Sequence, residues 1–225
     1  WLEGYRENIR AAVGCGAKYV VFHVAQARTS EIYTRQYAVT DEEVIEAALA
    51  VVNEITVDLP EKCYFLYENL WWPGLTFCQP ELARRLLDGT QYPHTGFMLD
   101  TGHLMNTNLL LHNEQQAVDY VLSTIEKLGD MQQQIYGMHL HCSLSGDFVQ
   151  KIQREQQGRA QKALDWQQTF SYIAGTDQHR PFQTHAVQWL IEKIQPAYLV
   201  HEFIQDSYED WERKLDIQYE AMGKA

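Results

Sequence analysis

Short apolar runs alternate with longer segments of helical periodicity along this chain. The runs are rich in β-branched and aromatic residues, which is typical of strands covered on both faces of a parallel sheet. Strands are predicted over 18–24, 63–67, 95–99, 135–140 and 197–200. Between them the apolar residues recur three or four positions apart, which indicates amphipathic helices. Helices are predicted over 1–17, 40–60, 80–89, 113–129 and 184–196, with a closing helix from 207.

Several of these helices begin with a recognisable capping signal. Thr40 with Glu43, and Asn113 with Gln116, have the spacing at which an N-cap side chain and the third helical residue bond each other's backbone. Thr184 is predicted to cap the helix that follows it. These signals set the predicted helix starts independently of the apolar pattern.

The alternation of strands and helices, with no break in composition, predicts one domain over 1–225 with parallel strands. Either a (β/α)8 TIM barrel or an open doubly wound α/β sheet has this order of elements. The barrel is favoured because polar residues follow many strands and no G-x-G-x-x-G or P-loop signature is present. Such a barrel needs eight strands in about 250 residues, so the five βα units imply that its N-terminal strands lie outside this sequence. The polar segment at about 145–170 is predicted to be an insertion with some helix.

Residues able to bind a metal stand at the ends of the predicted strands. They are His23, Glu68, Asp100, His139 and Glu202, with His103, Asp177 and His179 in adjacent loops. Imidazole nitrogen and carboxylate oxygen suit zinc, manganese or iron, whereas oxygen alone would suit calcium or magnesium. Singly, each residue is more often a hydrogen-bonded histidine or a solvated carboxylate. Together they favour a metal site, because a carboxylate after an apolar strand is costly to bury unless it is paired or coordinated.

Three further residues bear on the substrate. Trp71 and Trp72 follow Glu68 closely, and an indole ring can stack on a sugar or a base. Packing beneath the loop is the alternative for at least one of them. Arg180 could pair with a phosphate or carboxylate of the substrate, or stand exposed without such a role.

Charge and cysteine spacing narrow the class of protein. A formal charge of −12 and a pI near 5.1 favour a small substrate over nucleic acid, whose binding draws on clustered Lys and Arg. No apolar run reaches the length of a membrane helix. The four cysteines have no C-x-x-C spacing, which predicts reduced, mostly buried thiols and a cytoplasmic location.

The chain resembles the xylose isomerase-like TIM barrels, a family that includes sugar isomerases and epimerases and the endonuclease IV type of apurinic endonuclease. The resemblance covers nearly the whole chain and rests on YEN at Glu68, LDTGH at Asp100 and His103, GMHLHCS at His139, DQH at Asp177 and His179, and Glu202. Similarity to the epimerases implies one zinc or manganese ion held by Glu68, Asp100, His139 and Glu202. It also implies that the two glutamates exchange a substrate proton while His103 contacts a substrate oxygen.

The endonuclease type has a larger zinc cluster, which implies two or three ions here. Its further matches in this chain are His23, His103, Asp177 and His179. The chain departs from that type where HLND is expected, because it has HLHC with His141 and Cys142. His141 is therefore a candidate added ligand or substrate contact, and a neutral hydrogen-bonded histidine is the alternative.

Three functions remain open on the sequence. The first hypothesis is a metal-dependent isomerase or epimerase that acts on a small sugar or polyol by proton transfer between Glu68 and Glu202. The second is a multinuclear zinc phosphodiesterase or related hydrolase. The third is a barrel that has lost catalysis and only binds a ligand or partner, a case in which the chain could complete itself by association with another copy.

Overall fold

A computed structural model of the chain describes residues 1–57, 59–60, 63–156 and 165–224. Its described residues form one parallel sheet with the strand order β1-β2-β3-β4-β5. The strands are β1 (Tyr19–His23), β2 (Tyr64–Glu68), β3 (Thr95–Asp100), β4 (Ile135–Leu140) and β5 (Tyr198–His201). All five predicted strands are confirmed, as is the prediction of parallel pairing through helical connections.

The predicted helices are also present. They are α1 (Leu2–Gly14), α3 (Asp41–Ile55), α4 (Pro80–Gly89), α6 (Glu114–Glu126), α9 (Val187–Ile194) and α10 (Tyr208–Ala221). The apolar pattern did not predict three shorter elements, which are α2 (Thr29–Ile32), α5 (Thr101–Met105) and the 3-10 helix η1 (Gly129–Gln134). Two more helices, α7 (Gly146–Gln156) and α8 (Trp166–Thr176), occupy the predicted insertion, of which 157–164 lies outside the described residues.

Two of the three predicted caps are confirmed. The side chain of Thr40 accepts a hydrogen bond from the backbone of Glu43, and Asn113 accepts one from Gln116. The prediction for Thr184 is wrong, because α9 begins three residues later at Val187. The Thr184 hydroxyl instead donates to the Glu114 carboxylate at 2.8 Å. That acidic partner on α6 is distant in sequence, so the local pattern could not reveal it.

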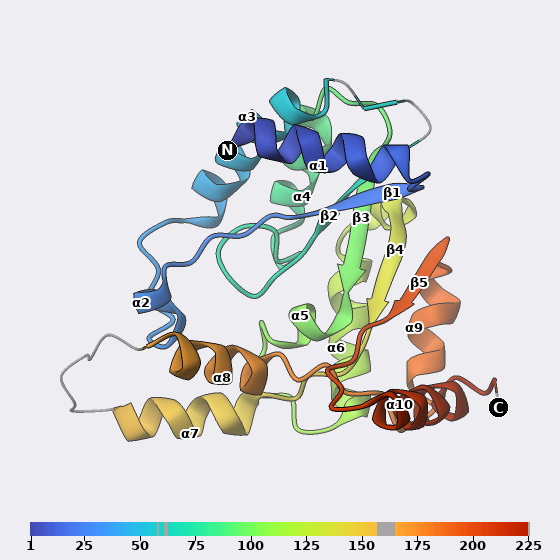
Figure 1. Cartoon of the computed structure of the whole chain (residues 1–225). Coiled ribbons are helices and arrows are strands. Elements are labelled where there is room, and N and C mark those ends of the chain that lie inside the picture. The colour runs from blue at the N-terminus through green and yellow to red at the C-terminus, as the bar shows by residue number, and fades with distance from the viewer. Residues whose placement is uncertain (58, 61–62, 157–164, 225) are drawn as a thin grey trace.

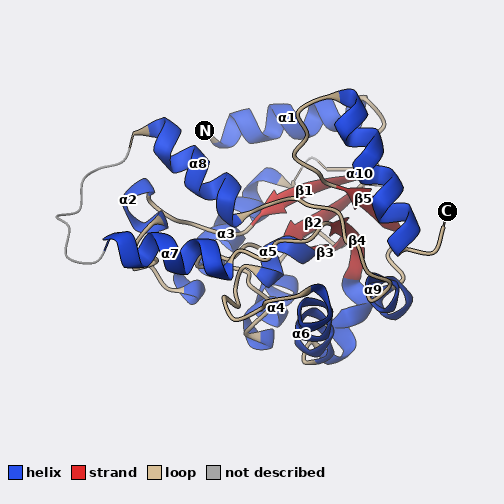
Figure 2. Ribbon diagram, turned by 90° about the horizontal axis from the view of Figure 1, so that it is seen from below, coloured by secondary structure: helices blue, strands red, loops and turns tan. Residues whose placement is uncertain are grey.

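The sheet curls into half of a barrel, as expected for the (β/α)8 fold. Figure 2 shows the strands following an arc with α4, α6 and α9 along its outer side. Buried side chains from β2, β3 and these helices, such as Phe65, Phe97, Leu86 and Val121, form the core between the layers. The rings of Tyr19, the first residue of β1, and Tyr198, the first residue of β5, lie 4.6 Å apart. The two edge strands therefore approach each other across the concave side.

The strands all run toward the same end of the molecule, where α2, α5, α7 and α8 gather (Figure 1). Connections that follow parallel strands collect at this end and form the ligand site in barrels of this kind. The predicted functional residues therefore share one face of the sheet and one end of it. No helix among the described residues has both the length and the apolar character needed to span a membrane.

All four cysteines are free, but they are not mostly buried as predicted. Cys63 and Cys142 are buried, whereas Cys15 and Cys78 are exposed. Cys15 lies just beyond α1, whose thirteen residues include none that is buried, so the apolar spacing of that helix overstated its burial.

Replacing Gly96 by alanine tests how tightly the concave face is packed. A Cβ at this position in β3 would come within 2.3 Å of the Tyr136 ring and 2.6 Å of the Gln134 carbonyl oxygen. Because a backbone atom cannot rotate away, we expect Gly96→Ala to lower the free energy of unfolding by about 1–3 kcal/mol. Urea denaturation measures the change. Gly4→Ala in α1, where a Cβ meets nothing within 4 Å, is the control and should not destabilise.

Candidate metal centre

The register of the sheet brings the predicted ligands together. His23 on β1 pairs directly with Glu68 on β2, and Asp100 on β3 pairs with His139 on β4. Glu68 lies opposite Met98, so Asp100, two residues further along β3, projects from the same face. By the same alternation Glu202 follows Val200, the partner of His139. A parallel sheet thus places one ligand-type side chain from each strand in a single layer.

The first group of side chains consists of Glu68, Asp100, His139 and Glu202. His139 Nδ1 lies 3.2 Å from Glu68 Oε1, 3.3 Å from Glu202 Oε1 and 3.8 Å from Asp100 Oδ2. Glu68 and Asp100 are almost fully buried, whereas the Glu202 side chain is 33% exposed. Glu202 therefore stands on the side of the group that solvent or substrate can reach.

Asp100 has a structural task in addition to any ligand role. Its Oδ1 caps α5 by accepting a hydrogen bond from the backbone N–H of His103 at 2.6 Å, so the D-x-x-H segment is the start of a helix. Asn69 holds the Asp100 backbone through two hydrogen bonds. Gly102 is needed in this helix because a Cβ would come within 2.1 Å of the His141 ring.

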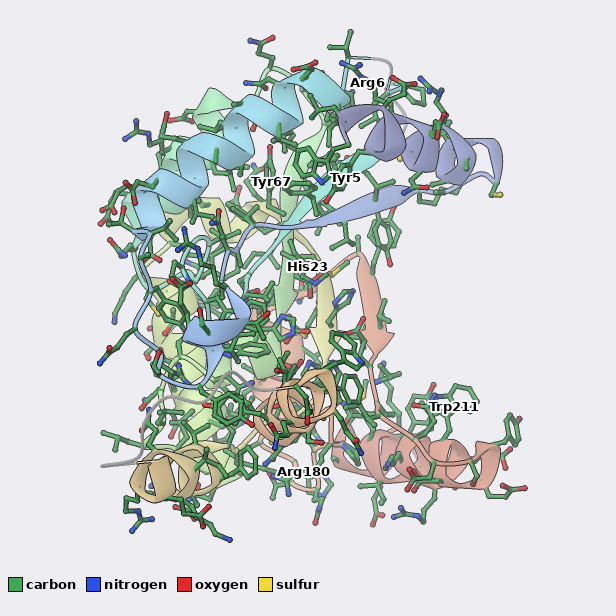
Figure 3. The ribbon with its side chains drawn as sticks, turned by 60° about the vertical axis from the view of Figure 1, so that its left-hand side comes forward. Tyr5, Arg6, His23, Tyr67, Arg180 and Trp211 are labelled. Carbon is green, nitrogen blue, oxygen red and sulfur yellow. The ribbon has the colours of Figure 1, made fainter. Side chains whose placement is uncertain are left out.

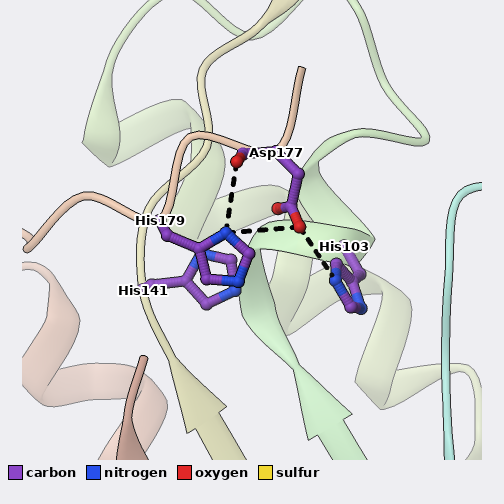
Figure 4. A group of neighbouring side chains, drawn as sticks. All are labelled: His103, His141, Asp177 and His179. Atoms are coloured by element: carbon purple, nitrogen blue, oxygen red, sulfur yellow. Dashed lines mark hydrogen bonds and ion pairs between the residues drawn. The ribbon is translucent and has the colours of Figure 1, made fainter. Parts of the chain in front are cut away.

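A second group adjoins the first and consists of His103, His141, Asp177 and His179 (Figure 4). Asp177 Oδ2 lies 3.2 Å from His103 Nε2 and 3.3 Å from His179 Nδ1. The rings of His141 and His179 stack at 4.0 Å and are inclined by 7°. The DQH and LDTGH motifs, more than seventy residues apart, therefore meet in one place.

Contacts between imidazoles and carboxylates tie the two groups into one centre. His141 Nε2 lies 2.9 Å from Asp100 Oδ2, and His179 Nε2 lies 3.6 Å from Glu202 Oε2. His103 Nδ1 lies 3.4 Å from Glu68 Oε1. Carboxylates thus stand between imidazoles throughout the centre.

His23 occupies the open side of the same centre. Its Nε2 lies 3.3 Å from Glu68 Oε2, and its side chain is 58% exposed. Figure 3 shows His23 near the middle of the molecule and Arg180 toward its lower edge. All eight metal-type residues predicted from the sequence are therefore neighbours.

The buried charges shift the ionisation of these groups. Burial opposes ionisation of Asp100, but the neighbouring histidines hold the pKa of its carboxyl well below the usual range. The pKa of Glu68 is likewise lowered against the effect of burial, mainly by the hydrogen bond from His139. Burial alone would lower the pKa of His103, yet the Asp100 carboxylate and the other acids raise it to about 10. The pKa values of His139 and His179 are also raised.

The donor set fits a transition-metal ion such as zinc. One ligand atom from each member of the second group lies within 4.8 Å of the others, and the same holds for Glu68 with Asp100 and His139. Buried His141 Nδ1 has no hydrogen-bond partner, and Glu68 Oε2 has only the contact with His23. Imidazoles mixed with carboxylates are the ligands that zinc accepts in proteins.

Trp71, Trp72 and Arg180, which were predicted as substrate contacts, lie in different environments. Trp71 is buried, and its ring lies 5.1 Å from that of His103, so it forms a wall of the centre. Trp72 packs on Trp71 at 5.2 Å with its indole nitrogen buried and without a partner. Arg180 is exposed, and its backbone pairs with Cys142. The pairing of its side chain with a substrate anion stays a prediction.

Several supporting residues were not predicted. The backbone carbonyl of Asn69 accepts a hydrogen bond from His103 Nδ1 at 2.9 Å, and the hydroxyl of Ser143 donates to Asp177 Oδ1 at 3.3 Å. The hydroxyl of Thr101 donates to the carbonyl of His141 at 2.6 Å. Each stands close to a predicted ligand in a motif, and that proximity was the available signal.

Residues 2–195 match the family described as the xylose isomerase-like TIM barrel. The chain belongs to this family. No curated protein matches it. Membership explains why the strand-end residues of one sheet edge lie together, since this is where the fold collects functional side chains.

Solved structures of similar fold include proteins of different chemistry. Endonuclease IV from Thermus thermophilus has a TM-score of 0.58 and 15% identity, covering 100% of this chain and 68% of that chain. The IOLI protein with a binding zinc atom has a TM-score of 0.56 and 14% identity, covering 99% and 69%. A D-tagatose 3-epimerase-like protein has 0.54 and 15%, covering 99% and 68%. At these identities the likeness extends to the fold alone, over about two thirds of each neighbour.

Zinc binding to this xylose isomerase-like centre should release protons. With its pKa raised to about 10, His103 is protonated in the metal-free chain at neutral pH, and a zinc ligand must be unprotonated. We therefore expect zinc affinity to increase with pH, up to about pH 10 where His103 loses its proton. Titration calorimetry in two buffers with different heats of ionisation measures the release. Identical heats in both buffers would contradict the prediction.

Proposed function

We propose that this chain is a metal-dependent hydrolase that cleaves a phosphoester of a small molecule at a centre of at least two divalent ions. The observation that carries the proposal is the second group, His103, His141, Asp177 and His179, directly beside the first. A one-ion epimerase needs only Glu68, Asp100, His139 and Glu202. Apart from His103, which would contact the substrate, the second group would then be a buried cluster without a chemical role.

Each group has a place in this proposal. Glu68, Asp100 and His139 would hold one ion, and His103, Asp177 and His179 would hold another, with His23 and Glu202 at the open side. The bound ions would activate a water and neutralise the charge of the phosphoester. The richness in imidazole favours zinc over manganese.

Glu202 is placed to handle the proton of the attacking water. It is the most exposed of the acids at the centre and lies within 3.3–3.6 Å of both His139 and His179. As water attacks phosphorus and the bond to the leaving oxygen breaks, Glu202 would accept the proton and return it to that oxygen. Trp71 would cover the apolar part of the substrate. We also propose that residues 1–225 form a single domain.

The acidic charge of the chain supports a small substrate. Eighteen Lys and Arg residues against thirty Asp and Glu residues leave no excess of cations for a nucleic-acid backbone. We therefore infer a small phosphoester as the substrate class and a cytoplasmic location, in keeping with the free cysteines.

Epimerisation of a small sugar remains the second candidate, and one observation favours it. Glu68 and Glu202 approach the same nitrogen of His139 from two strands, at 3.2 and 3.3 Å. Two carboxylates that face one ion could act as the base and the acid on opposite sides of a substrate carbon. In that case His103 would contact the substrate and a single ion would suffice.

Counting ions separates the two candidates. We expect elemental analysis of the zinc-loaded chain to find at least two ions, and His179→Ala to lose one of them while the other is retained. His112→Ala, which removes an exposed histidine away from the centre, should keep the full number. A wild-type chain with one ion that is indifferent to His179→Ala would support the epimerase instead.

Activity provides the complementary test. We expect the zinc-loaded chain to release p-nitrophenol from p-nitrophenyl phosphate esters, and Asp177→Asn to reduce the rate by about tenfold to a hundredfold through weaker metal binding. The same preparation is incubated with a panel of ketoses in heavy water. Deuterium incorporation without ester cleavage would overturn the hydrolase proposal in favour of epimerisation.

A further inference from the structure

Arg35, in the loop after α2, has an unusual environment for a cation. Its Nη1 is buried and has no hydrogen-bond partner, while Nη2 donates to the backbone oxygen of Asn106 at 3.1 Å. Within the described parts of the chain, no carboxylate lies within ion-pairing distance of it, and no other Lys or Arg has such an orphaned buried nitrogen. Arg35 as a residue is half-buried, but a guanidinium nitrogen that is buried without an acceptor is costly unless an anion completes its shell.

Glu31, the acidic residue nearest to Arg35 in the sequence, forms hydrogen bonds with the backbone of other residues. Glu31 is buried, and its Oε2 accepts a hydrogen bond from the backbone of Arg28 at 2.9 Å. Its Oε1 accepts one from Ala38 at 3.1 Å. Both oxygens stabilise the turn that carries Arg35, so Glu31 shapes this loop and does not neutralise the guanidinium.

Two further donors of the same region are buried without partners. They are Asn106 Nδ2 and the hydroxyl of Tyr37. Asn106 Oδ1 is occupied by the hydroxyl of Ser145 at 2.7 Å, which leaves the amide nitrogen as the free end. Burial raises the pKa of the Tyr37 phenol, and the nearby charge of Arg35 acts in the opposite direction. Three unsatisfied donors thus belong to one neighbourhood.

The backbone supports the same interpretation. Arg35 has a φ of +52°, in the left-handed region that residues with a side chain seldom adopt. Such strain persists where the surroundings hold it, and it is concentrated at functional sites. Glu31, which bonds both ends of the turn, supplies that restraint here.

This neighbourhood adjoins the metal centre. Asn106 ends α5, the helix whose third residue is His103, and lies one helical turn beyond it. Ser145, which contacts Asn106, lies two residues after Ser143, whose hydroxyl donates to Asp177. Asn106 and Ser145 therefore connect Arg35 to the two segments that carry His103 and Ser143.

We propose that Arg35, Asn106 and Tyr37 form a subsite for a phosphate group of the substrate, separate from the phosphoester at the metal ions. The clustering of one guanidinium with two neutral donors suits a tetrahedral oxyanion that accepts several hydrogen bonds. The assignment rests on the proposed function only in taking this anion as part of the substrate. It narrows that substrate to a small molecule with a phosphate beyond the scissile bond.

Inorganic phosphate is the probe that tests the subsite. Its binding to the zinc-loaded chain is measured by calorimetry for the wild type, Arg35→Gln and Arg28→Gln. Loss of charged hydrogen bonds should weaken phosphate binding by about tenfold to a hundredfold in Arg35→Gln. Arg28→Gln removes an exposed arginine seven residues earlier and should bind as the wild type does. Equal binding by Arg35→Gln and the wild type overturns the proposal.

Tyr37→Phe is a second variant that tests the subsite even if Arg35→Gln does not fold. It keeps the ring and removes only the hydroxyl, so we expect phosphate binding to weaken by about threefold to tenfold with an unchanged melting temperature. If Arg35→Gln does not fold, unchanged binding by Tyr37→Phe overturns the proposal. Acetate binding is measured for comparison. Tighter binding of acetate than of phosphate overturns the assignment of the subsite to a phosphate group.

Zinc content, measured in every variant, separates this proposal from the proposed function. Weakened phosphate binding at full zinc content supports the subsite, whatever ester the chain cleaves. One ion per chain, or no ester cleavage, would defeat the hydrolase while the difference between Arg35→Gln and Arg28→Gln still decides the subsite.

Discussion

Compensation of buried charge is the constraint on which the functional end of this molecule depends. Glu68 and Asp100 are held at the ends of central strands, where water cannot solvate them. Such carboxylates persist only with hydrogen-bond donors or positive charge beside them, and the imidazoles of His103, His139 and His141 lie within 2.9–3.4 Å of them. The same arrangement, with histidines unprotonated, is a set of ligands for cations. Ionisation and metal binding are therefore two ways to satisfy one physical requirement.

The second group of ligands changes the interpretation of His103. Considered with the first group alone, it would face a substrate oxygen; with Asp177 at 3.2 Å and His179 beyond it, it belongs to a cluster that can hold an ion of its own. Because Asp100 and Glu202 contact members of both groups, ions bound there would be close enough to act on one substrate. This coupling is what favours hydrolysis over proton exchange at a single ion.

The proposed substrate is an anion, and an acidic chain needs local cations to bind it. Metal ions would neutralise the reacting group, and Arg35 offers a half-buried guanidinium bonded to Asn106, which lies one helical turn from His103. Its isolation from carboxylates sets it apart from surface arginines such as Arg84 and Arg213, which are paired with aspartates. The net charge of the chain therefore bears on whether a nucleic-acid backbone can bind, and not on the charge that a small substrate meets inside the site.

Sequence alone was sufficient for the five strands, most helices, the family and the list of candidate metal ligands. Local apolar periodicity and short motifs encode these features, because strand ends and caps depend on neighbours in the chain. It could not place Thr184, whose partner Glu114 is remote, or separate exposed Arg180 from buried Trp71. Only the tertiary structure joined Asp177 to His103 and left Arg35 without a counter-ion, since register, curl and burial arise from contacts between distant segments. Those contacts decide which of the candidate residues form one centre.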